Sequence, residues 1–116
     1  MKCLMYPAGP GRRRGRRWVE SLPPADYYHA RLPPGAPRGE ATITIEELEA
    51  LRLIDLLGLP QEEAAASMGV SRKTLWRDLT SARRKLVEAL MNGWSIQIAG
   101  GNYILRGDMN KGERRW

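Results

Sequence analysis

The stretch Leu59–Leu86, LPQEEAAASMGVSRKTLWRDLTSARRKL, decides the fold, because it predicts two helices joined by a tight turn. Gly69 stands where a chain leaving a helix needs a positive φ, and Ser71 is a favoured N-cap for the helix that follows. Arg72 and Lys73 open that helix, although cations there oppose the helix dipole at a cost of roughly 0.3–1 kcal/mol. An anionic ligand would offset this cost. The arrangement is typical of a helix-turn-helix, which lays its second helix in a DNA groove.

The first two turns of that second helix supply the candidate groove-contacting side chains. The leading turns of a recognition helix reach the groove floor, where Arg and Lys donate to guanine and a Thr methyl meets a thymine methyl. An indole at Trp76 is equally suited to contact DNA and to pack against the first helix. We therefore predict DNA contacts from Ser71, Arg72, Lys73, Thr74, Trp76 and Arg77.

The same helix is predicted to run from Arg72 to about Asn92, with Gly93 ending it. Arg83 and Arg84 lie towards its far end, where cations either contact DNA phosphates or stabilise the helix terminus, and both interpretations stay open. Helical spacing predicts an inward-facing apolar set that consists of Met68, Val70, Leu75, Leu79, Leu86 and Leu90.

A preceding helix is predicted from Thr44 to Gly58. Thr44 and Glu47 match a capping box, and Gly58 supplies the stop. Its apolar residues recur at helical spacing. The remaining face is acidic, and we expect its carboxylates to face water and not to form a catalytic pair: Glu46, Glu47, Glu49 and Asp55.

The chain is strongly basic, with 116 residues, a formal net charge of +6 and a pI near 10.0. These values suit one small domain with tails and an acidic partner such as nucleic acid. Residues 1–41 contain seven of the eight prolines and predict a disordered or extended basic arm without a core of its own. A solvated tail is the alternative to an arm that neutralises phosphates or enters a narrow minor groove through Arg12, Arg13, Arg14, Arg16 and Arg17.

After the helices, residues 94–106 predict a β-hairpin. Two short apolar runs flank Gly100 and Gly101, which allow the positive φ values of a two-residue turn. An isolated hairpin is marginal in water, so it must pack on the helices or pair with a second copy to form a homodimer. Residues 107–116 then form a flexible polar tail.

Several classes of protein are excluded by composition. Cys3 is the only cysteine and His29 the only histidine, so the chain cannot build a disulfide framework or a cysteine/histidine zinc site. Nor can a nucleophile, base and orienting residue be assembled around them, so we expect no catalytic site and no cofactor. No apolar run is long enough for a membrane span or a signal peptide, which predicts a cytoplasmic, nucleoid-associated protein.

Three blocks of this sequence resemble the small prokaryotic proteins grouped as uncharacterised protein family 0251, also called domain of unknown function 134. They are GRRRGRRWVESLP at 11–23, ITIEELEALRLIDLLGLPQEEAAASMGVSRKTLWRDLTSARRKLVEAL at 43–90 and NGWSIQIAGGNYIL at 92–105. The central block is similar to the fourth region of sigma factors, and the resemblance implies DNA binding. Members often carry cysteines in the arm where this chain has Arg16 and Glu20, so metal or redox sensing does not carry over.

The sequence therefore predicts a mainly α fold. Residues 42–93 form a three-helix, sigma region-four-like helix-turn-helix domain, preceded by the arm and followed by the hairpin and tail. The predicted function is sequence-specific binding of double-stranded DNA by a transcriptional regulator, with RNA polymerase as a further partner. Two alternatives stay open: an RNA- or ribosome-associated basic protein, and a module that docks on polymerase or on a regulator.

Overall fold

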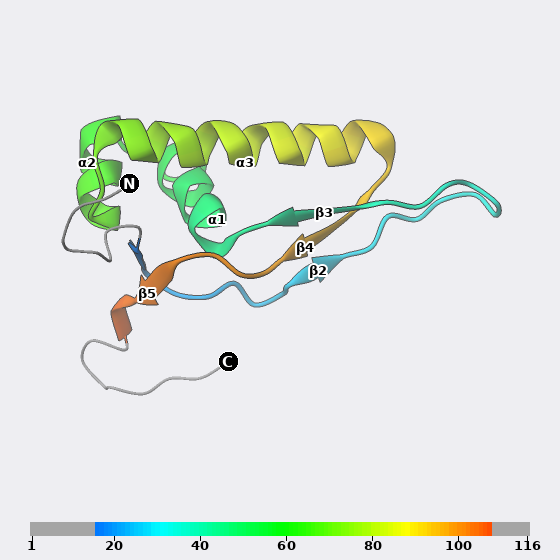
Figure 1. Ribbon diagram of the computed structural model, residues 1–116, viewed down its shortest axis with the longest axis horizontal. Coiled ribbons are helices and arrows are strands. Elements are labelled where there is room, and N and C mark those ends of the chain that lie inside the picture. The colour runs from blue at the N-terminus through cyan, green and yellow to red at the C-terminus, as the bar shows by residue number, and fades with distance from the viewer. Residues whose placement is uncertain (1–15, 108–116) are drawn as a thin grey trace, which may run out of the picture.

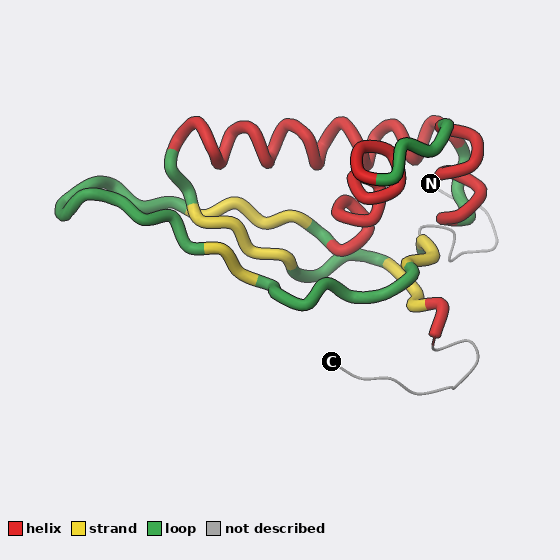
Figure 2. Tube along the Cα trace, turned by 180° about the vertical axis from the view of Figure 1, so that it is seen from behind, coloured by secondary structure: helices red, strands yellow, loops and turns green. Residues whose placement is uncertain are grey.

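The computed structural model describes residues 16–107, which contain three α-helices, one π-helix and five short strands (Figure 1). The long helix α3 runs along one side of the molecule, the strands lie on the other, and α1 stands between them (Figures 1 and 2). None of the helices between residues 16 and 107 combines the length and apolar content that crossing a bilayer requires. In chain order the elements are β1 Arg17–Val19, β2 Tyr27–Tyr28, β3 Glu40–Ile43, α1 Ile45–Leu51, the π-helical η2 Arg52–Leu56, α2 Gln61–Met68, α3 Arg72–Asn92, β4 Ser95–Ile98 and β5 Tyr103–Leu105.

The predicted helix ends are confirmed. Thr44 caps α1 through a capping box, in which its hydroxyl accepts from the Glu47 amide at 3.2 Å and its own amide donates to the Glu47 carboxylate at 2.9 Å. The helix continues as η2, and the chain then turns at Gly58 with φ of 73°. Gly69 and Gly93, both at φ of 70°, end α2 and α3 in the left-handed conformation that favours glycine.

The predicted β-hairpin over 94–106 is wrong. β4 lies between β2 and β3 in a three-stranded sheet, whereas β5 pairs in parallel with β1 in a separate two-stranded sheet. Gly100 and Gly101 have the positive φ values that a turn needs, but they carry the chain past the start of α1. The Gly100 carbonyl accepts from the Ile45 amide at 3.1 Å, and the Asn102 amide donates to the Glu46 carboxylate at 3.1 Å. A homodimer through a hairpin therefore has no basis in this fold.

The prediction that residues 16–41 are an arm without a core is also wrong. β1, β2 and the first residues of β3 lie in this range, and they contribute strands to both sheets. Val19 at the end of β1 is only 1% exposed, and β2 pairs with β4 across some 70 residues of sequence, with Tyr27 opposite Gln97. Strands of two to four residues are too short to show an alternating pattern, so only their distant partners define them. The arginines at positions 12 to 14 lie outside the described residues.

Two apolar clusters form the core. The larger joins η2, α2 and α3, where Met68, Leu75 and Leu79 are fully buried, as predicted. The smaller joins β1, α1 and β4 through Val19, Ile45 and Ile98. The inward prediction for Leu90 is wrong, since its side chain is 69% exposed. The last turns of α3 extend beyond α1 and α2 (Figure 1), so these two helices do not cover the end of α3.

The acidic face of α1 does not face water. Glu46, Glu47 and Glu49 are between 4% and 8% exposed, which overturns the expectation that they are solvated. The amphipathic pattern misled because neighbouring strands and α3 cover this face and supply hydrogen-bond donors. Buried carboxylates are tolerated where such donors satisfy them.

Each buried glutamate has its own partners. Glu46 accepts from the Asn102 amide, and Glu49 accepts two hydrogen bonds from Arg52, both at 2.9 Å. Glu47 accepts from Ser81 at 2.5 Å and from Lys85 at 2.9 Å, so it joins α1 to the middle of α3. Burial raises the pKa of Glu47, but the hydrogen bonds from Ser81, the Thr44 amide and Lys85 outweigh it and hold that pKa below its usual value.

Candidate nucleic-acid interface

The turn between α2 and α3 is closed by backbone and side-chain hydrogen bonds. The amide of Val70 donates to the Ala65 carbonyl at 3.0 Å, which completes the left-handed cap at Gly69. Ser71 then caps α3, because its hydroxyl accepts from the Thr74 amide at 3.1 Å and lies 3.1 Å from the Thr74 hydroxyl. The turn therefore positions the first turn of α3 rigidly, and the predicted contact Ser71 is engaged within it.

Side chains from β1 and from the end of β5 support this turn. A Cβ at Gly69 would lie 2.7 Å from the indole of Trp18, so the backbone approaches that ring as closely as only glycine allows. The guanidinium of Arg106 lies 5.4 Å from the centroid of the Trp18 ring and also donates to the Ser67 carbonyl of α2. The α2–α3 corner is thus fixed against the β1–β5 pair.

A cationic stripe runs along the solvent side of α3. Lys73, Arg77 and Arg84 are spaced by four and seven residues, so they share one face of the helix, and all three are exposed. Within residues 16–107 they make no ion pair or side-chain hydrogen bond with another group. The guanidinium of Arg72 lies 3.6 Å from the carboxylate of Glu62 in α2. Both side chains are exposed, so this ion pair contributes little to stability. The stripe can therefore bind an anion without first breaking contacts within the domain.

Arg83 differs from its neighbour Arg84. It donates to both carboxylate oxygens of Asp55, at 3.1 and 2.7 Å, and its guanidinium lies 6.0 Å from the centroid of the Trp76 ring. This hydrogen-bonded pair lowers the pKa of Asp55 and raises the pKa of Arg83. Trp76 itself is 47% exposed, so its ring is half available to a ligand and half covered. Of the two predicted contacts at 83 and 84, only Arg84 has its guanidinium free among the described residues.

Arg17 also has a partner within the domain. Its guanidinium donates to both oxygens of Asp78, at 2.9 and 3.0 Å, with both side chains largely buried. This pair ties β1 to the second turn of α3, and the neighbouring Arg16 is exposed. Sequence reasoning missed the role of Asp78. An acid flanking the buried Leu79 in a basic helix was the available signal, since such a residue needs a cationic partner.

Of the six residues predicted at the start of α3, Ser71 is its N-cap and the other five lie on its first two turns, while Arg84 lies farther along the face of Lys73 and Arg77. Arg17 and Arg83 are placed in ion pairs, and the predicted contacts Arg12, Arg13 and Arg14 fall outside residues 16–107. Groups of cysteine, histidine and acidic side chains that could hold a metal ion are absent from the described part of the chain.

Comparison with known proteins gives a family match over nearly all of the fold. The sequence profile of a family described as "Protein of unknown function DUF134" matches residues 9–106. The range includes every described helix and strand. No solved structure matches the chain.

Relatives in archaea and bacteria carry the name UPF0251 protein. One from Methanocella arvoryzae is 50% identical over 95 residues, which are 82% of this chain and 57% of the relative. One from Methanosarcina acetivorans is 52% identical over 93 residues, 80% of this chain and 55% of the relative. One from Pyrococcus furiosus is 47% identical over 102 residues, 86% of this chain and 94% of the relative. The chain thus spans a little over half the length of the first two.

Proposed function

The chain belongs to the DUF134 family, and from the geometry of α2 and α3 we propose that it is a sequence-specific double-stranded DNA-binding protein that regulates transcription. In this proposal α2, the turn at Gly69 and α3 form a helix-turn-helix of the sigma region-four type, with α1 as its third helix. The second helix of such a motif enters the major groove with its N-terminal residues towards the base edges.

The observation that carries the proposal is the exposed cationic start of α3, where Lys73 and Arg77 have no ion pair with any described residue. Lys73 and Arg77 lie on its first two turns and are free to donate to guanine O6 and N7 or to phosphates. The absence of an acidic residue in the first turn leaves the positive end of the helix dipole available to an anion. We assign contacts with DNA bases to Lys73, Thr74 and Arg77. We assign contacts with the phosphate backbone of DNA to Arg72 and Arg84.

The contact between β1 and α3 supports a role for the same surface. The Arg17–Asp78 pair holds β1 against α3 at 2.9 Å, one residue after Arg16. The exposed Arg16 therefore adjoins the residue that contacts the second turn of α3. Arginines at this position can add phosphate or minor-groove contacts to the same DNA segment.

The decisive experiment is selection of binding sites from a random pool of DNA duplexes. The intact chain is compared with a Lys73→Ala/Arg77→Ala variant and with an Arg31→Ala/Arg38→Ala control. The control removes the same charge from exposed arginines in the loop between β2 and β3, which projects beyond the opposite end of α3 (Figure 1). Both variants thus change net charge equally, and only one changes the proposed site.

We expect a defined DNA motif for the intact chain and the control, and loss of that motif for the Lys73/Arg77 variant. An equal loss in both variants would mean that net charge alone attracts DNA and would overturn the proposal. A parallel selection from a random RNA pool that gives tighter binding than the duplex pool would also overturn it, because the A-form major groove is too narrow for a helix.

A further inference from the structure

The parallel pair of β1 and β5 brings two distant segments of the chain together. Trp18 lies opposite Ile104 in this pair, and Val19 lies opposite Leu105. A sheet of only two such short strands is marginal by itself, so contacts with other elements must hold it in place. The packing on the two sides of β1 therefore decides what this pair can do.

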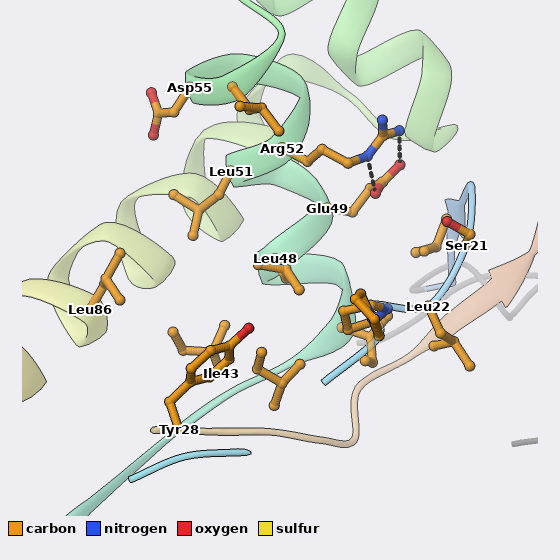
Figure 3. A pocket seen from close by; sticks show the side chains of 16 residues that line it. Ser21, Leu22, Tyr28, Ile43, Leu48, Glu49, Leu51, Arg52, Asp55 and Leu86 are labelled. Carbon is orange, nitrogen blue, oxygen red and sulfur yellow. Dashed lines mark hydrogen bonds and ion pairs between the residues drawn. The ribbon is translucent and has the colours of Figure 1, made fainter. Parts of the chain in front are cut away.

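One side of β1 borders a groove. Consecutive side chains of a strand point to opposite faces, so Trp18 and Val19 lie on different sides of β1. Val19 lines a groove of about 680 Å³, which Ser21 and Leu22, just after the strand, also line (Figure 3). Packing on this side leaves space beside the chain. The side of Trp18, in contrast, is in close contact with the corner between α2 and α3.

Trp18 and Arg106 connect the two strands to the backbone of that corner. A Cβ at Gly69 would lie 2.7 Å from the indole of Trp18, so backbone and ring are as close as glycine permits. Arg106 directly follows β5, and its guanidinium lies 5.4 Å from the centroid of the same ring. The guanidinium also donates to the Ser67 carbonyl, and its Nε lies 3.6 Å from the Glu20 carboxylate. One side chain thus contacts the strand pair and the last turn of α2 together.

The corner sets the direction in which α3 leaves α2. The Val70 amide donates to the Ala65 carbonyl, and Ser71 caps α3 immediately afterwards. A shift of the corner would therefore turn the start of α3, where Lys73 and Arg77 lie. Hydrogen bonds to base edges weaken steeply when their angles change, whereas attraction to phosphates is sequence-independent and less directional. Such a shift would reduce base recognition more than general attraction to DNA.

From these contacts we infer that Trp18 and Arg106 are positioning residues for base recognition, although neither lies on α3. The inference rests on the proposed function and names residues outside the site that set its specificity. The groups that contact a ligand must be held within about 0.5 Å by their supporting side chains. Arg106 meets this need because its guanidinium holds both the ring of Trp18 and the end of α2.

The test compares the intact chain with Arg106→Met and with Arg38→Met as the matched control. Both arginines are exposed, and each substitution removes one guanidinium and keeps an apolar stem. Arg38 lies in the loop between β2 and β3. Trp18→Phe is the second variant, because it keeps an aromatic ring but shortens it. Affinity is measured for the duplex that the intact chain selects and for an unrelated duplex of equal length.

Hydrogen exchange without DNA measures the corner directly. The amides of Gly69 and Val70 donate across the corner, and the Leu57 amide, which donates to the Arg52 carbonyl at 2.8 Å, is the internal reference. In Arg106→Met we expect exchange at the two corner amides to become about tenfold faster, with no change at Leu57. The same pattern, to a smaller extent, is expected for Trp18→Phe.

In the binding measurement we expect Arg106→Met to lower the ratio of specific to non-specific affinity about tenfold or more. Its affinity for the unrelated duplex should fall no further than that of Arg38→Met. Unchanged exchange at the corner would overturn the inference, and so would an unchanged affinity ratio. An equal loss for both duplexes, with faster exchange at all three amides, would also overturn it, because the side chain would then only stabilise the fold. Failure of the proposed function is distinguishable, since the intact chain itself would select no duplex, and that result would overturn both.

Discussion

The two ends of α3 expose opposite kinds of side chain. The first two turns present Lys73 and Arg77 after a capped N-terminus, whereas the last two leave Val87, Leu90 and Met91 exposed. Both ends belong to one continuous helix of 21 residues, which spans about 30 Å at 1.5 Å per residue. The difference shows how one continuous helix can carry a cationic surface at one end and exposed apolar side chains at the other.

The middle of α3 connects its two ends, and substitution of a buried residue there should have the largest effect on stability. Leu79 is fully buried in the cluster with η2 and α2. Leu79→Ala is expected to destabilise the fold by about 2–5 kcal/mol through the cavity it creates. Urea unfolding should report this loss, and duplex binding should decline with it. A variant that loses duplex binding at unchanged stability would show that this leucine acts on the binding surface and not through the core.

The Arg17–Asp78 pair is the next most sensitive point, because it belongs only to the end of α3 that we propose contacts DNA. Asp78→Ala leaves the largely buried guanidinium of Arg17 without its two hydrogen bonds to the carboxylate. We expect a loss of about 2–3 kcal/mol in the free energy of unfolding. A double-mutant cycle with Arg17→Met isolates the pairwise contribution. Additive single substitutions would indicate that the pair does not hold β1 on α3.

Glu47 contacts the middle of α3 through Ser81 and Lys85, and its lowered pKa predicts that the stability of the fold depends on pH. Its pKa is lowered in the folded chain, so its stabilising contribution is present above the unfolded pKa and disappears as pH falls through the folded pKa. Ser81→Ala removes the hydroxyl 2.5 Å from its carboxylate and should cost about 1.5 kcal/mol at neutral pH. The cost should shrink on acidification. An equal cost at all pH values would mean that the hydroxyl acts through packing and not through the carboxylate.

Substitutions of Arg83 and Arg84 should have the smallest effects, and they distinguish a paired arginine from an unpaired one in DNA binding. They are adjacent, but one is paired with Asp55 and the other is exposed on the cationic stripe. Arg84→Ala should reduce the salt dependence of DNA affinity by about one unit of slope, as removal of one phosphate contact does. Arg83→Ala should leave that slope nearly unchanged. Equal slopes for the two variants would show that position along α3, and not pairing, decides which cation contacts DNA.

Local sequence signals determined the helices of this protein. Capping at Thr44 and Ser71, left-handed glycines at 69 and 93, and helical spacing of apolar residues act within one or two turns, so they can be recognised in the sequence alone. The same signals placed Lys73 and Arg77 at an exposed helix start. The local part of the candidate site was therefore predictable.

Only the tertiary structure decided what is made by contacts between distant residues. The strand partners of β4 and β5, the burial of Glu46, Glu47 and Glu49, and the Arg17–Asp78 pair join segments that are tens of residues apart. Short strands lack a pattern of their own, and a carboxylate is buried only where distant donors satisfy it. The helices could be predicted from the sequence because their hydrogen bonds are local. The sheets and the groove were not, because the groups that form them meet only after folding.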